Sequence, residues 1–290
     1  MKRCQLKHSN FQIITKMNKE NKPLVKHENG NDFIADVTSS VFCQDNLELL
    51  KSQPDESIDL IYCDILYGTG RNFGDYQDLK PIRSVIEAHY LPRLKEMHRV
   101  LKSTGSIYLQ MDTRINHWIR CIMDGIFSYD NFLNEIVWYY NSMSNTKNKY
   151  PKKHDCILFY SKSANYKFNH EHKSLRKEYA SNTISRSKTK AGFNNDKADY
   201  LNGNTYLVQD VWIDINFLKN GVEYNTQKPK ALIERIINAS TNEGDTVADY
   251  YLGSGTTAVV CKELNRNFIG CDINQKAIEI TKNRLMDINL

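Results

Sequence analysis

The segment from Asp245 to Thr257 carries a glycine-rich turn that could bind a nucleotide-like cofactor. It reads as a short buried strand that ends at Asp249, followed by a turn and the start of a helix. Gly253 and Gly255 would let the backbone approach a ligand closely. The helix could be capped by one of three hydroxyl side chains, Ser254, Thr256 and Thr257.

This turn lacks the features of a phosphate-binding loop. A P-loop needs a Lys after its glycine, and no Lys follows Gly255, while a dinucleotide fingerprint needs a third glycine where Ala258 stands. About twenty residues farther on, Asp272 closes the apolar run Asn267–Cys271, at the place where an acidic side chain binds a ribose diol. Ribose binding without pyrophosphate binding predicts S-adenosylmethionine as the cofactor.

A second acidic side chain stands at the end of another predicted strand. The run Ile58–Cys63 is almost continuously apolar, which is typical of a buried strand, and Asp64 follows it directly. Tyr67 comes three residues later. Ligands of open parallel sheets bind at the carboxyl ends of the strands, so we expect Asp64 and Asp249 to belong to one site.

Seven strands that alternate mostly with helices are predicted to position these residues. The strands are expected over 39–45, 58–63, 106–111, 135–140, 156–160, 246–250 and 267–271. Helices are expected over 46–51, 85–101 with a kink at Pro92, 114–127, 228–238 and 258–264. This alternation predicts a mostly parallel α/β sheet. Fewer than fifty residues follow Thr246, so the strand before the glycine turn must share its sheet with upstream strands.

The composition is that of an ordinary soluble chain, with 40% hydrophobic and 25% charged residues among 290. No run of about eighteen apolar residues and no apolar segment near Met1 indicate a membrane span or a signal peptide, so we expect a cytoplasmic protein. The seven cysteines are scattered and lack Cys-x-x-Cys spacing. This pattern argues against a disulfide framework and a zinc site, and no metal is expected.

The net charge of +5 is unevenly distributed. A basic cluster with interleaved Asn, Tyr and His suits contacts with DNA phosphates and bases. Its candidate DNA-binding residues are Lys147, Lys149, Lys152 and Lys153. Residues 161–211 are polar, basic and aperiodic, which predicts a loop-rich insertion rather than sheet or core. Residues 1–38 are polar and rich in Lys, and we expect a flexible, irregular arm there.

Further segments complete a set of motifs, and the set resembles the β class of amino-group DNA methyltransferases. In that class a catalytic Asp-Pro-Pro-Tyr block precedes the target-recognition region, and the cofactor glycine block comes last. The resemblance runs from about Val41 to Leu285. Besides the glycine turn, it rests on Cys63–Phe73, Leu101–Leu109, Asn134–Trp138, His154–Lys162, Thr226–Pro229 and Arg266–Asp272.

The resemblance implies a circularly permuted, Rossmann-like methyltransferase fold that binds S-adenosylmethionine. Residues 39–160 would form the catalytic half, 161–211 the target-recognition region and 212–290 the cofactor-binding half. Asp64 and Tyr67 are the implied catalytic residues, which face a base flipped out of double-stranded DNA. The implied cofactor-binding residues are Asp45 near the adenine, Asp272 at the ribose, and Asp64, Thr226, Gln227, Lys228, Asp249, Tyr251, Gly253, Ser254, Gly255 and Thr256 around them.

The chain departs from the family pattern where Ile65 and Leu66 replace the two prolines; Tyr250-Tyr251 also replaces a Pro-Phe pair. The lone pair of the adenine amino nitrogen is delocalised into the ring. The Asp64 carboxylate and the carbonyl of residue 65 must therefore hold the two N–H groups and direct that lone pair to the methyl group. Ile65 and Leu66 keep this carbonyl and lose only the restriction of φ, worth about 0.4 to 1 kcal/mol. We expect a few-fold loss of activity at most.

The sequence thus predicts a site-specific DNA adenine-N6 methyltransferase, either part of a restriction-modification system or an orphan. A DNA cytosine-N4 methyltransferase and a catalytically silent DNA-binding relative are the alternatives. A cytosine-C5 enzyme needs a nucleophilic Cys, usually after Pro, and the chain has no Pro-Cys pair. The expected partners are double-stranded DNA, a cognate restriction endonuclease and a second copy of the chain.

Overall fold

The computed structural model describes residues 40–73, 77–140, 146–179, 205–217 and 227–288, and the backbone of 24–26 and 32–34. Its centre is an eight-stranded sheet in the order β10-β6-β7-β5-β4-β11-β12-β3. The strands in this order are Val211–Trp212, Phe132–Tyr139, His154–Ser161, Leu101–Met111, Ile58–Asp64, Thr246–Asp249, Asn267–Asp272 and Val41–Cys43. β7 is antiparallel to β5 and β6, and the other neighbours are parallel. The predicted α/β class with a mostly parallel sheet is confirmed.

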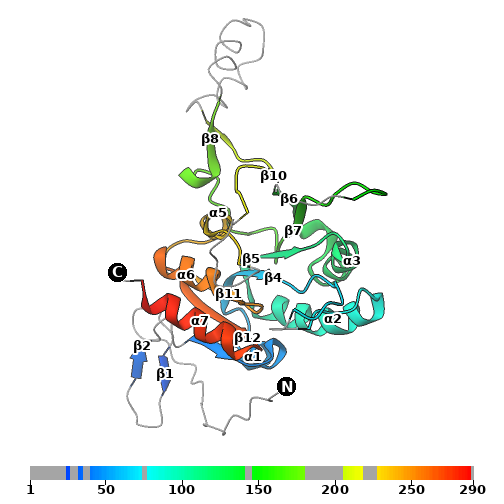
Figure 1. The fold of residues 1–290 in the computed structure, drawn as a ribbon. Coiled ribbons are helices and arrows are strands. Elements are labelled where there is room, and N and C mark those ends of the chain that lie inside the picture. The colour runs from blue at the N-terminus through cyan, green and yellow to red at the C-terminus, as the bar shows by residue number, and fades with distance from the viewer. Residues whose placement is uncertain are drawn as a thin grey trace, which may run out of the picture.

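Helices cover both faces of the sheet (Figure 1). α1 (Asn46–Ser52), α2 (Arg83–Val100) and α3 (Asn116–Phe127) lie on one face. α5 (Lys230–Ser240), α6 (Thr256–Glu263) and α7 (Gln275–Met286) lie on the other. Along β4, Ile61 and Cys63 belong to the core on the side of α1, α2 and α3. Leu60 and Tyr62 belong to the core on the side of α5, α6 and α7. Burial on both faces explains why this strand reads as a continuous apolar run.

The sheet has one strand more than the seven predicted. β10 has only two residues, Val211 and Trp212, which pair with Val137 and Trp138 of β6. Two residues are too few to give a periodic pattern, so the sequence could not reveal this edge strand. Trp212 is buried, and the chain therefore returns to the core at the end of the region that was predicted to be an insertion.

Two segments predicted to be irregular contain short strands, and these predictions were wrong in that respect. Within residues 1–38, β1 (Leu24–Lys26) pairs antiparallel with β2 (Asp32–Ile34). Within 161–211, β8 (Arg176–Glu178) pairs antiparallel with β9 (Thr205–Leu207), and β8 projects away from the main sheet (Figure 1). Strands of three residues are too short to show a periodic hydrophobic pattern. The polar composition of the segments around them therefore gave no indication of strands.

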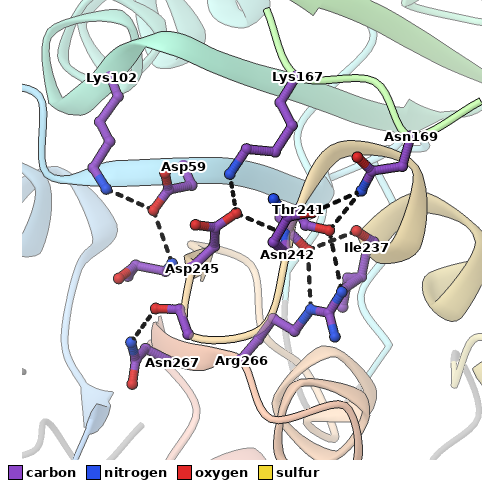
Figure 2. Close-up of polar contacts among 12 residues, drawn as sticks. Asp59, Lys102, Lys167, Asn169, Ile237, Thr241, Asn242, Asp245, Arg266 and Asn267 are labelled. Atoms are coloured by element: carbon purple, nitrogen blue, oxygen red, sulfur yellow. Dashed lines mark hydrogen bonds and ion pairs between the residues drawn. The ribbon is translucent and has the colours of Figure 1, made fainter.

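Polar side chains fix the amino ends of the parallel strands (Figure 2). Asp59, near the start of β4, accepts hydrogen bonds from Lys102 Nζ at 2.7 Å and from the Thr246 N–H at 2.9 Å. Lys167 forms an ion pair with Asp245 at the start of β11. Asp59 and Asp64 thus lie at opposite ends of the same strand, and Asp59 has a structural role remote from the other end. Within the described residues, no helix is long and apolar enough to cross a membrane.

Candidate active site

Four acidic side chains meet at the carboxyl edge of the sheet, as the sequence predicts. β4, β11, β12 and β3 are neighbours in this order. In the register, Asp249 lies opposite Gly270, and Asp272 lies opposite Cys43. The acidic residues at or just after the four strand ends are Asp64, Asp249, Asp272 and Asp45. Parallel pairing therefore assembles them from segments that are up to 227 positions apart in the chain.

The glycine turn after β11 is held by two of these carboxylates. Asp272 accepts a hydrogen bond from the Gly253 N–H at 2.9 Å and another from the Asn274 N–H at 2.9 Å. Asp249 accepts from the Tyr251 N–H at 3.0 Å and from the Thr257 hydroxyl at 2.6 Å. Burial raises the pKa of both carboxyl groups, that of Asp249 to about 7.

The hydroxyl side chains of the turn do not cap α6. The helix begins after Gly255, whose φ of 77° suits glycine, and no side-chain hydrogen bond caps it. Thr257 bonds Asp249 instead, and the hydroxyls of Ser254 and Thr256 lie 3.3 and 3.4 Å from Arg284 of α7. The capping prediction was wrong because the buried Asp249 and the α7 contact engage these hydroxyls.

Residues of α1 and α2 adjoin the acidic edge and the glycine turn. Asp45 accepts a hydrogen bond from the Leu47 N–H at the start of α1, and forms an ion pair with Arg93 Nη2 at 2.8 Å. The Tyr251 hydroxyl lies 3.0 Å from His89 Nε2, and burial lowers the pKa of His89 to about 4. Arg93 and His89 were not recognised from the sequence. Their spacing of four residues on one helix face was the available signal.

Asp64 and Tyr67 are hydrogen-bonded to each other, as expected for one site. The Tyr67 hydroxyl lies 2.8 Å from Asp64 Oδ1, and Lys228 forms an ion pair with Asp64 Oδ2. The Lys228 ammonium also lies 5.4 Å from the centre of the Tyr67 ring. Burial raises the pKa of Asp64, and the nearby Lys228 opposes this shift. Of the predicted residues 226–228, Gln227 and Lys228 are described, and Thr226 lies outside the described residues.

The Tyr67 hydroxyl also contacts a residue whose role the sequence did not reveal. Asp155 of β7 lies 2.6 Å from it through Oδ2. The same aspartate accepts hydrogen bonds from Gln110 Nε2 and the Tyr140 hydroxyl, both at 2.9 Å. Asp155 is an acidic residue within the mostly buried strand β7. This unusual position was the available sign of a functional role.

Hydrogen bonds hold the turn at Ile65 and Leu66 in place of prolines. The Ile65 N–H donates to the Gln110 carbonyl at 3.0 Å, which extends the β4–β5 pairing. The Leu66 carbonyl accepts from the Tyr90 hydroxyl at 2.9 Å. Proline at position 65 would lose the first of these bonds, whereas proline at position 66 keeps its carbonyl.

Ile65→Pro should therefore destabilise the protein by about 0.5 to 1.5 kcal/mol through the lost hydrogen bond. Leu66→Pro serves as the matched control and should leave the free energy of unfolding within about 0.5 kcal/mol of the natural chain. Urea unfolding of both variants measures the difference. Equal stability of the two variants would contradict a role for the Ile65 N–H.

A basic cavity of about 560 Å³ contains two of the four predicted DNA-binding lysines. Its lining consists of Arg71, Arg114, Thr146, Lys149, Tyr150 and Lys152. Arg114 and Lys152 share an ion-pair partner, Asp112, which follows the end of β5 beside β4. Lys147 is exposed and does not line the cavity, and the Lys153 carbonyl accepts a hydrogen bond from the Tyr140 N–H. Arg71 and Arg114 were missed because they are distant from the basic cluster in sequence.

Comparison with known proteins decides the family. A family model described as DNA methylase matches residues 58–283. This chain belongs to the DNA methylase family. The resemblance predicted from the motifs is therefore confirmed.

Two curated DNA methylases are each 33% identical to this chain. One is the Type II methyltransferase M.HpaI of Haemophilus parainfluenzae, aligned over 251 residues that cover 84% of this chain and 73% of that protein. The other is the DNA adenine methyltransferase YhdJ of Escherichia coli (strain K12), aligned over 246 residues that cover 83% of this chain and 80% of that protein.

Solved structures of methyltransferases share the fold. The cytosine-N4-specific PvuII DNA methyltransferase matches with a TM-score of 0.61 at 17% identity, over 86% of this chain and 87% of that chain. The M1.HpyAVI–SAM complex matches with a TM-score of 0.55 at 21% identity, over 84% of this chain and 98% of that chain. The predicted methyltransferase fold is confirmed, and at these identities the likeness concerns the fold alone.

Proposed function

We propose that this chain transfers a methyl group from S-adenosylmethionine to the N6 amino group of an adenine flipped out of double-stranded DNA. The observation that carries the proposal is the Asp64 carboxylate at the end of β4, hydrogen-bonded to Tyr67 and placed on the same sheet edge as the glycine turn. Membership of the DNA methylase family supports it.

The acidic side chains at this edge fit S-adenosylmethionine better than a phosphate-bearing cofactor. Asp64, Asp249 and Asp272 lie around the turn. Carboxylates repel phosphates and attract a sulfonium, whose positive charge would in turn favour their ionised forms. Asp272 would hold the ribose, since a carboxylate offers about four acceptor positions and the N–H groups of Gly253, Ile273 and Asn274 take at most three. Asp45 would lie near the adenine, and Gly253 would be close to the methionine end. When bound, S-adenosylmethionine supplies an electrophilic methyl group.

The residues around Asp64 would orient the target amino group. Lys228 opposes the effect of burial and favours the ionised form of Asp64, which is the form that accepts N–H hydrogen bonds. The carbonyl of Ile65 would accept the second N–H of the amino group. Extrusion of the base costs a few kcal/mol, and stacking on Tyr67 could return about 1 to 3 kcal/mol.

The identity of the methylated base separates this proposal from its alternatives. YhdJ is named an adenine methyltransferase and PvuII a cytosine-N4-specific one, so the shared fold accommodates either base. The purified chain should transfer labelled methyl groups to mixed-sequence DNA, and digestion to nucleosides should place the label in N6-methyldeoxyadenosine. Label in N4-methyldeoxycytidine would identify the alternative enzyme, and no label would indicate a silent DNA-binding relative.

We further infer that the basic cavity contacts DNA phosphates and that residues 161–211, with the projecting β8–β9 pair, recognise the target sequence. The names of Type II relatives support a cognate restriction endonuclease as a partner. We also propose a homodimer and a cytoplasmic location.

Lys149→Ala should lower the salt dependence of DNA binding by about one, in the slope of log affinity against log salt concentration. Lys152→Ala should lower it less, because the pairing of Lys152 with Asp112 already neutralises part of its charge. Lys51→Ala, an exposed change at the end of α1, is the control and should leave the slope unchanged. Equal slopes for all three variants would remove the cavity from the DNA interface.

A further inference from the structure

The Tyr67 hydroxyl lies between carboxylates from two different strands. It is 2.8 Å from Asp64 Oδ1 on β4 and 2.6 Å from Asp155 Oδ2 on β7. A phenol has one hydrogen and can donate to one of these oxygens. The other close oxygen pair becomes a hydrogen bond once one of the carboxyl groups takes up a proton. The three side chains are therefore built to share a proton.

Asp155 is suited to receive that proton. Its side chain belongs to a residue that is 3% exposed, and its hydrogen-bond donors, Gln110 and Tyr140, are neutral. Asp64, by contrast, forms an ion pair with Lys228. None of the ion pairs found among the described residues includes Asp155. The Tyr67 hydroxyl thus bridges one carboxylate that is paired with a cation and one that is paired with neutral donors.

The rest of the network fixes Asp155 and leads outward. The side chain of Gln110 is itself oriented by the Tyr62 hydroxyl, which donates to the amide oxygen Oε1 at 2.8 Å. Tyr140 donates to Asp155 Oδ1 and is partly exposed. The hydrogen bonds from Asp64 through Tyr67 and Asp155 to Tyr140 thus connect the site with the protein surface.

We propose that Asp155 accepts, through Tyr67, the proton that the target amino group loses during methyl transfer. The inference rests on the proposed function. When the amino nitrogen bonds to the methyl carbon, the carbon–sulfur bond breaks, the sulfonium becomes a neutral thioether, and the nitrogen becomes cationic with one surplus proton. That proton passes to Asp64, Asp64 gives a proton to the Tyr67 oxygen, and the Tyr67 hydroxyl proton passes to Asp155. One proton enters at Asp64 and one arrives at Asp155, and Tyr67 is unchanged.

The test is the pH dependence of single-turnover methyl transfer, which excludes slow product release. Asp155→Asn keeps the shape of the side chain and removes its ability to take the proton. We expect the rate at neutral pH to fall at least about tenfold, since general acid–base groups contribute about a hundredfold or more. The equilibrium affinities for S-adenosylmethionine and DNA should stay within about twofold of the natural chain, because Asp155 is not among the residues proposed to hold either ligand.

The acidic limb of the rate profile should also move to lower pH in Asp155→Asn. The charge of Asp155 contributes to raising the pKa of Asp64, so its removal lowers that pKa. The other titratable groups that face this pair are Lys228, Tyr62, Cys63, Tyr67, Tyr140, Cys156 and Asp249. All of them are retained in the variant.

Two further variants make the result decisive. Tyr67→Phe keeps the ring for stacking but removes the bridging hydroxyl, and should lower the rate as Asp155→Asn does. Asp59→Asn replaces another buried aspartate of the sheet and should leave the rate and its pH profile unchanged. A purely structural role for Asp155 predicts lost thermal stability with an unchanged rate and profile, and this result would overturn the proposal. An inactive natural chain would instead refute the proposed function itself, and the relay with it.

Discussion

Asp64→Asn should lower the single-turnover rate of methyl transfer at least about a hundredfold. Positive charge develops on the amino nitrogen as it bonds to the methyl carbon, and Asp64 is the carboxylate that faces it in the proposed complex. Removal of one preorganised group that stabilises developing charge costs about a hundredfold to a thousandfold. Asparagine also presents its NH2 group toward the N–H groups of the base. Rapid-quench measurement with labelled cofactor gives the rate.

Asparagine is a better replacement than alanine because Lys228 depends on Asp64. The Lys228 side chain is 11% exposed, and Asp64→Ala would leave its ammonium buried without a partner. Such a loss destabilises a protein by about 3 to 5 kcal/mol and would confuse folding with chemistry. Asp59→Asn provides the matched control, with full activity expected. A rate for Asp64→Asn within about tenfold of the natural chain would refute the role of the carboxylate, given the magnitude expected.

Asp249→Asn should make the cofactor-free protein more stable than the natural chain at pH 8, and this advantage should shrink as the pH falls. Burial raises the pKa of Asp249 from 3.8 to about 7. Between these values the folded state holds a proton that the unfolded state releases, so the free energy of unfolding falls as the pH rises. A shift of this size corresponds to at most about 4 kcal/mol, fully expressed above pH 7 and absent below about pH 4.

Urea unfolding of both proteins between pH 5 and pH 8 measures this difference. Thr257→Val adds a test of the cause, since the Thr257 hydroxyl bonds Asp249 Oδ2 at 2.6 Å and lowers its pKa. Without this hydroxyl the pKa should rise further, and the loss of stability should continue to higher pH. A stability difference between Asp249→Asn and the natural chain that does not change with pH would contradict the buried, protonated state of Asp249.

The sequence was sufficient to predict the sheet and the acidic edge because both depend on local patterns. β4 and β11 are runs of apolar residues that end in an aspartate, and parallel strands place their ends together. The glycine turn was recognisable because its two positions with positive φ are filled by glycine, Gly253 and Gly255, which is visible in the sequence. β8, β9 and β10 were missed, since two or three residues carry no period.

The partners of the site could not be predicted because they depend on contacts between distant segments. Asp155 reaches Tyr67 across 88 positions of sequence, and Lys228 reaches Asp64 across 164. Nothing in the residues around Asp155 indicates that β7 runs antiparallel beside β5 and brings its carboxylate to the site. The resemblance implied that Ser254 and Thr256 belong to the cofactor site, but it gave no sign that α7 places Arg284 beside their hydroxyls.

The central claim is tested most directly by methylation-sensitive sequencing of DNA from cells that express the chain or its Asp64→Asn variant. We predict N6-methyladenine at nearly every copy of one short sequence in cells with the natural chain, and none at that sequence in cells with the variant. Methylcytosine at the target, or the same N6-methyladenine pattern in both cell lines, would contradict adenine methylation by the Asp64 site.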